Sequence, residues 1–512
     1  MNKSDMSNRW RNSRFRAKIS ATLHWLRKVS NVRIIFFTYL LIVLASSLLL
    51  WSPITHAEEG KNKISYMDAI FTTASAFSDT GLVSVDSYST WNMFGQAIIA
   101  TLILSGGIGI FALKIFFISI LFPRAKNSVN SMRVIAHERG SDELGTTKQI
   151  ILHSVATLLI ITFISGMFLS LYFYLASPRS TGNIDFHGQF ISPKGNVSLA
   201  FRYGFFHTIS AINNAGFDII GQNSLMSYYW NIELQLYFAF LFLIGGLGYP
   251  VIYDITGFIK HLLTNRKNRQ RYIFKLITKI SVTTYLITTL IGFSLLCAFE
   301  FAAKSNSFAS NGDYGNWAQK TWQLFFLSLS TRSAGFSTIQ INHLTNGSII
   351  VLTILMFIGA GPVSTGGGVR TTTIAILVLA IFNKILGRPT VRVFKRRIPD
   401  ETVKMSSIVF CISAFLTFAW VLIISSSLDT YGGKLNAIEY NFVHLAFEVC
   451  SALGTSGLTV GVTRDLNIVS KIFLIIMMFI GQFGITSSVL VWGKKANNSF
   501  KYEYIQEEVM IG

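Results

Sequence analysis

Four short polar segments that end in glycine carry the chemistry suggested by this sequence. Each reads Phe-x3-Ser, then a short run, then Gly followed by Leu or Phe. They are FTTASAFSDTGL (71–82), FHTISAINNAGF (206–217), FLSLSTRSAGF (326–336) and FEVCSALGTSGL (447–458). Glycine permits dihedral angles that turn carbonyl oxygens toward one point, and a ring of carbonyls can replace the water around a cation. The repeat therefore predicts a cation site built from four loops.

The predicted ligands are the backbone groups of each repeated glycine and of the two residues before it. These twelve residues are Asp79, Thr80, Gly81, Asn214, Ala215, Gly216, Ser333, Ala334, Gly335, Thr455, Ser456 and Gly457. The third segment is one residue shorter than the others between its serine and its glycine. A single glycine after a polar run is often only a turn. Four copies in register, each between apolar spans, favour a repeated site.

The composition indicates what must position these loops. Of the 512 residues, 51% are hydrophobic and only 13% are charged, which is typical of a polytopic membrane protein. The net charge of +20 lies in short basic runs between apolar spans. A basic face with interleaved aromatic residues, which is typical of nucleic-acid binding, is absent from the sequence. We therefore expect the lipid bilayer, and no nucleic acid, as a partner.

The apolar spans predict an all-α membrane protein of four tandem helix–pore-loop–helix units. Eight transmembrane helices and four re-entrant pore loops are expected in a pseudo-fourfold arrangement. The predicted units are residues 34–121, 149–258, 276–382 and 405–492. A basic tail (1–33) precedes them and a short tail (493–512) follows. Only the second long helix of the third unit is expected to be broken.

The distribution of Lys and Arg predicts the orientation. The tails and the loops that join units hold 31 of these residues, whereas the alternate loops hold 8. Because basic loops stay on the cytoplasmic side, both termini should be cytoplasmic in a multi-pass plasma-membrane protein.

The break in the third unit is a candidate gate. Gly359, Gly361 and Pro362, followed by Gly366, Gly367 and Gly368, interrupt an apolar span. Proline removes a backbone donor and glycine loosens a helix, so the chain should break in mid-membrane. The alternative is a kink that allows close packing, since Gly106-Gly107, Gly245-Gly246 and Gly481 occupy corresponding positions in the other units.

Taken together, these motifs resemble the Trk/Ktr/HKT superfamily of potassium transporters, nearest to the membrane (pore) subunit of the bacterial Ktr type. The resemblance covers roughly residues 30–495 and rests on NNAGFD (213–218), TRSAGF (331–336), FEVCSALGTSGL and STGGGVRTTT (364–373). It implies potassium uptake through one pore per chain, with potassium bound in the filter and no cofactor in this chain. A homodimer, an intramembrane gating loop at residues 361–368 and a separate cytoplasmic ring of nucleotide-binding subunits are also implied. Glycine at all four filter positions goes with potassium preference in this superfamily.

Two residues depart from the superfamily's pattern. Gln482, the seventh candidate gate residue, stands where an arginine under the filter is usual, which removes a charge from the expected ion path. Asp79 stands in the first filter segment where an uncharged residue is more common. Asp79 either concentrates cations at the mouth or caps its loop through hydrogen bonds. Arg332 is expected to be structural, with Glu448 as a candidate partner.

Other functions stay open at this stage. The pore could carry another monovalent cation, such as sodium or ammonium, and potassium flux could be passive or sodium-assisted. A membrane-bound lipid-modifying enzyme would need converging catalytic groups, and none are evident. No strand–GxGxxG–helix unit occurs in the sequence, so the nucleotide-binding partner should be separate. Its predicted docking residues are Arg266, Lys267, Arg269 and Arg271.

Overall fold

The computed structural model describes residues 31–57, 64–121, 144–181, 190–221, 224–264, 271–303, 307–430 and 440–485. These residues are predominantly helical, which confirms the all-α prediction. The described strands are one pair of two-residue strands, β1 (Arg392–Val393) and β2 (Arg396–Arg397). Most of both predicted tails, and the predicted docking residues Arg266, Lys267 and Arg269, lie outside the described residues.

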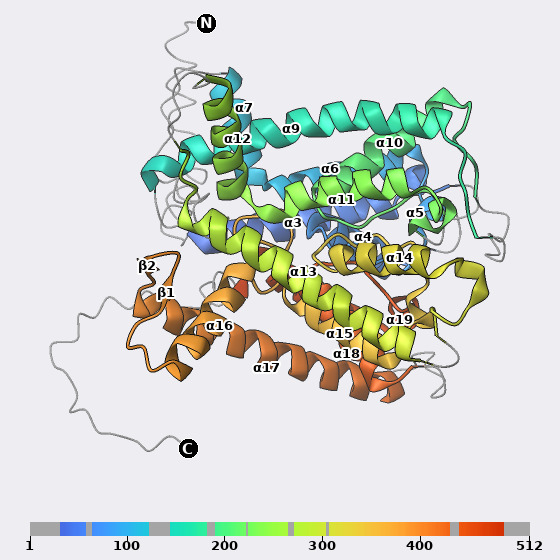
Figure 1. The fold of residues 1–512 in the computed structure, drawn as a ribbon. Helices are drawn as coiled ribbons and strands as arrows, with labels where there is room; N and C mark the ends of the chain where they lie inside the picture. The colour runs from blue at the N-terminus through green and yellow to red at the C-terminus, as the bar shows by residue number, and fades with distance from the viewer. Residues whose placement is uncertain are drawn as a thin grey trace, which may run out of the picture.

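Each repeat begins with a long apolar helix. These helices are α3 (Asn31–Trp51), α9 (Leu144–Leu175), α13 (Leu276–Ala302) and α17 (Asp400–Thr430). Each contains a stretch long and apolar enough to cross a bilayer. In Figure 1, α9 runs along the top of the molecule and α17 along the bottom. Large apolar side chains such as Leu41 and Phe415 are 67% and 71% exposed on these helices, as expected for surfaces that contact lipid.

A short helix follows in each repeat and leads to the glycine loop. The short helices are α4 (Tyr66–Phe77), α10 (Val197–Ile212), α14 (Trp317–Ser330) and α18 (Phe442–Gly454). Each begins after a serine or asparagine whose side chain caps the first free N–H groups, namely Ser65, Asn196, Asn316 and Asn441. At 12 to 16 residues they are too short to span a bilayer, as predicted.

The second helix of every repeat is interrupted, not only that of the third. The helices are α6 (Met93–Ile108) and α7 (Ile110–Leu121), α11 (Ile232–Leu247) and α12 (Tyr249–Thr264), α15 (Asn346–Phe357) and α16 (Thr371–Ile385), and α20 (Ile468–Phe483). Gly109, Gly248 and Gly484 end α6, α11 and α20 with φ values of 87°, 93° and 87°. The axes of α11 and α12 differ by 110°.

The expectation of continuous second helices in the first, second and fourth units was therefore wrong. A left-handed residue cannot continue a right-handed helix, and glycine adopts this conformation at little cost. A repeated Gly-x-x-Gly pattern, at 106–109, 245–248 and 481–484, is the signal that could have identified all three breaks.

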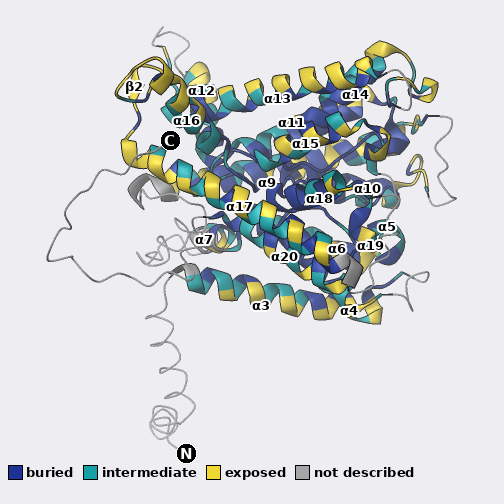
Figure 2. Cartoon of the chain, turned by 90° about the horizontal axis from the view of Figure 1, so that it is seen from below, coloured by how far each residue is buried: buried dark blue, intermediate teal, exposed yellow. Residues whose placement is uncertain are grey.

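Short elements complete the connections between helices. They are η1 (Pro53–Thr55), α5 (Ser87–Thr90), η3 (Ser224–Tyr228), η4 (Gly312–Tyr314), η5 (Ile341–His343) and α19 (Val462–Asp465). The buried apolar residues form two large clusters, one centred on the first two repeats and the other on the last two. Figure 2 shows these buried residues in the interior and the exposed ones along the outer helices. The glycine loops lie where the repeats meet.

Candidate functional site

The four repeated glycines lie against one another in a closed ring. A Cβ atom added to Gly81 would stand 2.3 Å from the carbonyl oxygen of Ala215, and one added to Gly335 would stand 2.3 Å from that of Ser456. Likewise, a Cβ on Gly457 would meet Thr80 O at 2.3 Å, and one on Gly216 would meet Gly335 Cα at 2.9 Å. The segments 79–81, 214–216, 333–335 and 455–457, hereafter the filter segments, therefore converge as the repeat predicted.

All four filter segments share one backbone conformation. In each, the first and last residues have positive φ: 51° and 84° at 79 and 81, 59° and 67° at 214 and 216, 64° and 76° at 333 and 335, and 46° and 81° at 455 and 457. This is rare for residues other than glycine. The carbonyl oxygen of each middle residue then lies beside the glycine of the adjoining repeat. These middle residues are Thr80, Ala215, Ala334 and Ser456.

The serine of the repeat motif holds this conformation in place. The N–H of each middle residue donates to the serine carbonyl at 2.8–2.9 Å, in the pairs Thr80–Ser75, Ala215–Ser210, Ala334–Ser330 and Ser456–Ser451. Three of the serine hydroxyls also donate to the carbonyl that follows the glycine, in the pairs Ser210–Phe217, Ser330–Phe336 and Ser451–Leu458. Ser75 Oγ has no hydrogen-bond partner among the described residues. The Phe-x3-Ser motif is thus a loop clamp.

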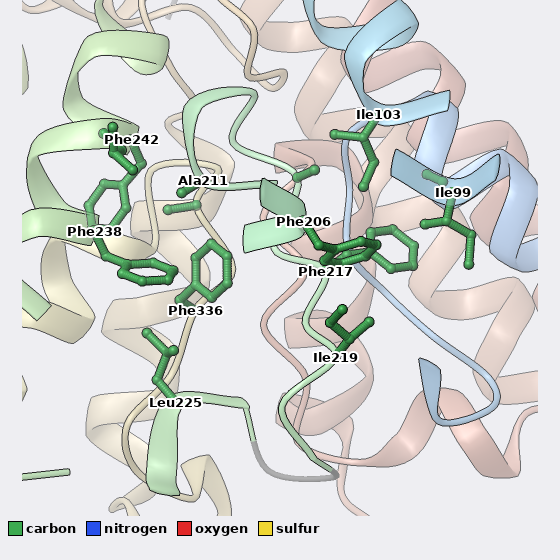
Figure 3. Packing of buried hydrophobic residues seen from close by; sticks show 14 of the residues in the cluster. Ile99, Ile103, Phe206, Ala211, Phe217, Ile219, Leu225, Phe238, Phe242 and Phe336 are labelled. Carbon is green, nitrogen blue, oxygen red and sulfur yellow. The ribbon is translucent and has the colours of Figure 1, made fainter. Parts of the chain in front are cut away.

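The apolar residue after each glycine anchors the loop in the core. Phe336 packs against Phe238 of α11 with ring centroids 4.9 Å apart, and Phe217 lies toward Ile99 and Ile103 of α6 (Figure 3). Both phenylalanines are at most 1% exposed. The second and third loops are therefore fixed against the second helix of the preceding repeat, which leaves their backbone carbonyls little freedom to move.

Six of the seven predicted gate residues lie in one irregular stretch between α15 and α16, and the seventh, Gln482, lies on α20. This stretch, residues 358–370, is hereafter the axial loop. It connects two repeats, because Gly361 N donates to Gly246 O at 2.8 Å and Gly368 N donates to Gly481 O at 3.2 Å. Its glycines are needed for close backbone contact, since a Cβ on Gly359 would stand 1.9 Å from Gly367 O. Pro362 lies in the same stretch, next to Gly248.

The axial loop also contacts the filter segments directly. Thr365 Oγ1 donates to Asn214 Oδ1 at 3.4 Å, and Gly367 N donates to Thr455 Oγ1 at 2.7 Å. A Cβ on Gly366 would stand 2.6 Å from Ser333 Cβ. Three of the four left-handed residues that begin the filter segments thus touch residues 365–367.

Gln482 connects the remaining filter segment to the axial loop. Its Nε2 lies 3.0 Å from Asp79 Oδ2 and 3.0 Å from the carbonyl oxygen of Thr365, and it donates to both. The two residues that depart from the superfamily's pattern are therefore in contact with each other. Of the two roles considered for Asp79, the geometry favours the hydrogen-bonded one. The axial loop thus contacts the second, third and fourth repeats directly and is linked to the first through Gln482.

Arg332 does not pair with Glu448, so that expectation was wrong. The guanidinium of Arg332 donates to Gly359 O at 3.3 Å and to Thr288 Oγ1, and it lies 5.3 Å from the ring centroid of Tyr285. The Glu448 carboxylate instead accepts bonds from the segment after its own filter loop, from Thr459, Val460 and Thr463. Arg332 is buried and holds the start of the axial loop.

The glycines that precede the breaks have a packing role as well. A Cβ on Gly106, Gly245 or Gly481 would stand 2.0–2.1 Å from the carbonyl oxygen of Phe77, Ile212 or Leu453 respectively. These carbonyls belong to the last turns of the short helices. The packing interpretation of these glycines is therefore confirmed for the first, second and fourth repeats.

One contact at the far end of the first and fourth repeats could not be found from the sequence. Lys471 Nζ on α20 lies 2.9 Å from Asp68 Oδ1 on α4, and Ser84 Oγ donates to the same carboxylate oxygen. The pair thus joins the first repeat to the fourth. No local sequence pattern identifies such a contact.

Taken as a whole, the site offers a narrow ring of backbone carbonyls with an irregular loop directly beside it. Among the described residues, no group of three or more His, Cys, Asp or Glu side chains could hold a metal ion. The chemistry available is coordination of a cation by backbone oxygen.

Comparisons with known proteins agree with this geometry. A family model described as TrkH, cation transport protein, matches residues 8–502. The chain is 32% identical to the Ktr system potassium uptake protein D of Bacillus subtilis, over 95% of this chain and 98% of that protein. It is 31% identical to an uncharacterized cation transporter, MG322, of Mycoplasma genitalium, over 95% and 99% of the two chains. A crystal structure of the potassium transporter TrkH from Vibrio parahaemolyticus has the same fold, with a TM-score of 0.61 at 18% identity over 90% of this chain and 84% of that one.

Proposed function

Because the chain belongs to the TrkH family of cation transport proteins, we propose that it forms the membrane pore of a potassium uptake system. A relative named a potassium uptake protein is 32% identical to this chain over 98% of its length, which supports potassium as the cargo. The family consists of cation transporters, so the lipid-modifying enzyme considered from the sequence is excluded.

The filter segments are the proposed site of ion selection. The observation that carries this proposal is the closed ring of glycines, in which each middle-residue carbonyl lies beside the next repeat. An ion that enters such a ring must exchange water for carbonyl oxygens. The short helices end at the ring, and their C-terminal carbonyls add partial negative charge there. Both features favour a bound cation and require no acidic ligand in the ring.

The axial loop and Gln482 are the proposed gate. The loop contacts the second, third and fourth repeats beside the filter and is linked to the first through Gln482, so an ion that leaves the ring meets it next. Val363 has a φ of 57°, which is a strained conformation for a β-branched residue. Strain of this kind costs energy and often marks a segment that changes conformation in function. Displacement of the loop would open the path.

The four predicted units, with the predicted boundaries, are the proposed functional modules of this pore. We place both termini on the cytoplasmic side of the plasma membrane, because the basic residues concentrate in the tails and in the loops that join units. In this orientation the glycine loops enter from the outer side.

We also propose a homodimer controlled by a separate cytoplasmic ring of nucleotide-binding subunits. The described basic surface on the proposed cytoplasmic side supports a docking role. Residues 392–397 form a hairpin with a two-residue turn, in which Phe394 and Lys395 have φ values of 48° and 63°. Arg392, Arg396 and Arg397 are exposed beside it, and Phe394 is 47% exposed at its tip. An exposed aromatic residue among arginines is typical of a protein-binding surface.

The proposed function can be tested in two steps. Expression of the chain, with its native partners, should restore growth of potassium-uptake-deficient cells at low potassium. Purified protein in liposomes should then take up potassium, and an excess of potassium should compete better than sodium or ammonium. Growth rescue should depend on the nucleotide-binding ring, and Gly335→Ser should weaken the discrimination between potassium and sodium. An intact, inserted protein that transports no monovalent cation would overturn the proposal.

The alternative cargo is another monovalent cation. One glycine per repeat offers fewer stacked coordination sites than a longer filter, so selectivity rests on few carbonyls. If sodium or ammonium competes better than potassium in the same liposomes, the cargo assignment changes but the pore assignment stands. Imposing a sodium gradient of either direction in these liposomes tests sodium assistance.

A further inference from the structure

The first and fourth repeats are not consecutive in the sequence, but they lie against each other along an interface that we call the seam. In this seam α4 and α20 lie side by side. Two polar contacts close its ends, Lys471–Asp68 at one end and Gln482–Asp79 at the other. The partners in each pair are 403 positions apart in the sequence. Asp79 therefore follows Asp68 by eleven positions, and Gln482 follows Lys471 by the same number. The two elements therefore run in the same direction.

A cavity of about 490 Å³ lies along this seam, between α3, α4, α17 and α20. We call it the seam cavity. Its walls come from residues 36–43 of α3, 74–78 in and just after α4, Leu416 of α17 and 475–485 in and just after α20. Two aromatic contacts lie in its walls, with Phe36 and Phe479 centroids 5.3 Å apart and Tyr39 and Phe77 centroids 4.7 Å apart. Figure 2 shows α3, α17 and α20 on one face of the molecule.

The lining of the seam cavity selects for an apolar ligand. Among its lining residues in the described part of the chain there is no charged side chain, and the polar members apart from Tyr39 are Ser78 and Gln482. Ser78 Oγ bonds to Thr80 Oγ1 at 2.7 Å, within its own loop. The Gln482 amide N–H groups are directed to Asp79 and Thr365. Because these donors are used inside the protein, an anionic headgroup finds no free donor on Ser78 or Gln482, and the atom of Gln482 without a partner among the described residues is the acceptor Oε1.

The mouth of the seam cavity is continuous with the lipid-facing surface. Leu40 and Ile476, which line it, are 44% and 41% exposed, and Phe37 and Leu44 on the same helix as Leu40 are 55% and 39% exposed. In a family of membrane transporters, the medium in contact with this surface is the acyl region of the bilayer. The occupant can therefore enter sideways from the membrane.

The size of the seam cavity fits a single acyl chain. Its volume is within the range of about 300–1,000 Å³ that is usual for small-ligand sites. The walls on α3 and α20 extend about 10–15 Å along the helix axes at 1.5 Å per residue. This is about half of the hydrocarbon thickness, the depth of one leaflet. We propose that the seam cavity binds one acyl chain of a bilayer phospholipid, as a specific site between the first and fourth repeats.

Photolabelling tests this proposal independently of the cargo. The full-length protein is reconstituted into bilayers of phosphatidylethanolamine and phosphatidylglycerol that contain a trace of phosphatidylglycerol with a diazirine on one acyl chain. After illumination, labelled peptides are mapped by mass spectrometry. Peptides that contain residues 36–43 and 475–485 should be labelled several-fold more than the lipid-facing part of α9 around Ile160, which is 58% exposed.

Cavity-filling variants provide the control. Val43→Trp and Leu416→Trp fill the seam cavity from opposite walls, and either should reduce its labelling to the level of α9. Ile160→Trp adds the same side chain to an exposed face and should leave the seam labelling unchanged. Seam labelling no higher than that of α9, or unchanged by both filling variants, would overturn the proposal.

Discussion

Replacement of Gly335 by serine should weaken ion discrimination, because the filter ring has no space for a side chain at this position. A Cβ atom on Gly335 would stand 2.3 Å from Ser456 O and 2.7 Å from Gly216 Cα. Since such contacts are not found below 3.0 Å, the Ser456 carbonyl would have to move by at least 0.7 Å. The atoms that must move belong to two other repeats, so one substitution disturbs three of the four filter segments.

The energy of this change has two parts. A residue with a Cβ at the φ of 76° found for Gly335 costs about 1–2 kcal/mol. Displacement of the ring carbonyls then reduces the difference between the free energies with which the ring coordinates potassium and sodium. If that difference falls by about 1.4 kcal/mol, discrimination falls about tenfold. Gly81 and Gly457 face carbonyls at the same 2.3 Å, whereas the nearest atom to a Cβ on Gly216 lies at 2.9 Å. Serine at 216 should therefore have the mildest effect.

Gly195 offers a matched control for backbone strain. It has the same φ of 76° as Gly335, but nothing lies within 4 Å of a Cβ added there. Gly195→Ser therefore has the same dihedral cost but does not displace the filter. Its ratio of potassium to sodium uptake should equal that of the unmodified chain. The assay is tracer uptake of potassium and of sodium by the same liposomes, with insertion measured separately. Wild-type ratios in all four serine variants, each correctly inserted, would refute the assignment of these glycines to a filter.

Four further predictions concern the proposed gate and the partner. Deletion within residues 361–368 should raise potassium flux in liposomes and reduce its dependence on the nucleotide-binding ring; unchanged dependence would return this stretch to a packing role. Gln482→Ala should also raise flux, because it removes two hydrogen bonds worth roughly 0.5–3 kcal/mol each, the larger value applying to the carboxylate of Asp79. Gln482→Arg should lower flux, and more strongly when Asp79→Asn removes the nearby charge; equal effects in both backgrounds would argue against coupling of the pair. Pull-down from native membranes should recover a soluble nucleotide-binding protein, and Phe394→Ala or Arg396→Glu should reduce its recovery; full recovery with both variants would place docking elsewhere.

The repeated elements of the fold were predictable because their signals are local. The Phe-x3-Ser motif encodes a hydrogen-bonded clamp within a dozen residues, so its four copies identify the loops without knowledge of the rest of the chain. The long first helices follow from the length and hydropathy of their spans. The apolar residue after each glycine was part of the same motif, although its packing partners became evident only in the structure.

The elements that were missed depend on contacts between distant repeats. Arg332 and Glu448 seemed complementary by charge, but Arg332 is held by Gly359 of the axial loop and by Thr288 of α13, and Glu448 by the segment after its own filter loop. The contact between Asp79 and Gln482 joins residues at opposite ends of the chain, and only the fold brings them to 3.0 Å. The helix breaks were a different kind of omission. Gly109, Gly248 and Gly484 are visible in the sequence, but the apolar spans around them were long enough to suggest continuous helices.

The helix breaks and the axial loop depend on one another. A helix that ends inside a membrane leaves carbonyl and N–H groups without partners, which is costly where water is excluded. At the break between α11 and α12, Gly246 O accepts from Gly361 N at 2.8 Å, and Tyr249 N donates to Val363 O at 3.0 Å. At the end of α20, Gly481 O accepts from Gly368 N at 3.2 Å.

The loop of the third repeat thus satisfies groups that the breaks in the second and fourth repeats expose. This arrangement explains why a ring with fourfold backbone conformation lies beside a single asymmetric loop. Because the second and fourth repeats supply the hydrogen-bond partners of this loop, only one chain segment, that of the third repeat, can lie between them beside the filter ring. Movement of that segment must break these bonds together, because all of them end on residues 361–368. A change at any one of the breaks should therefore alter opening even though it touches no filter residue.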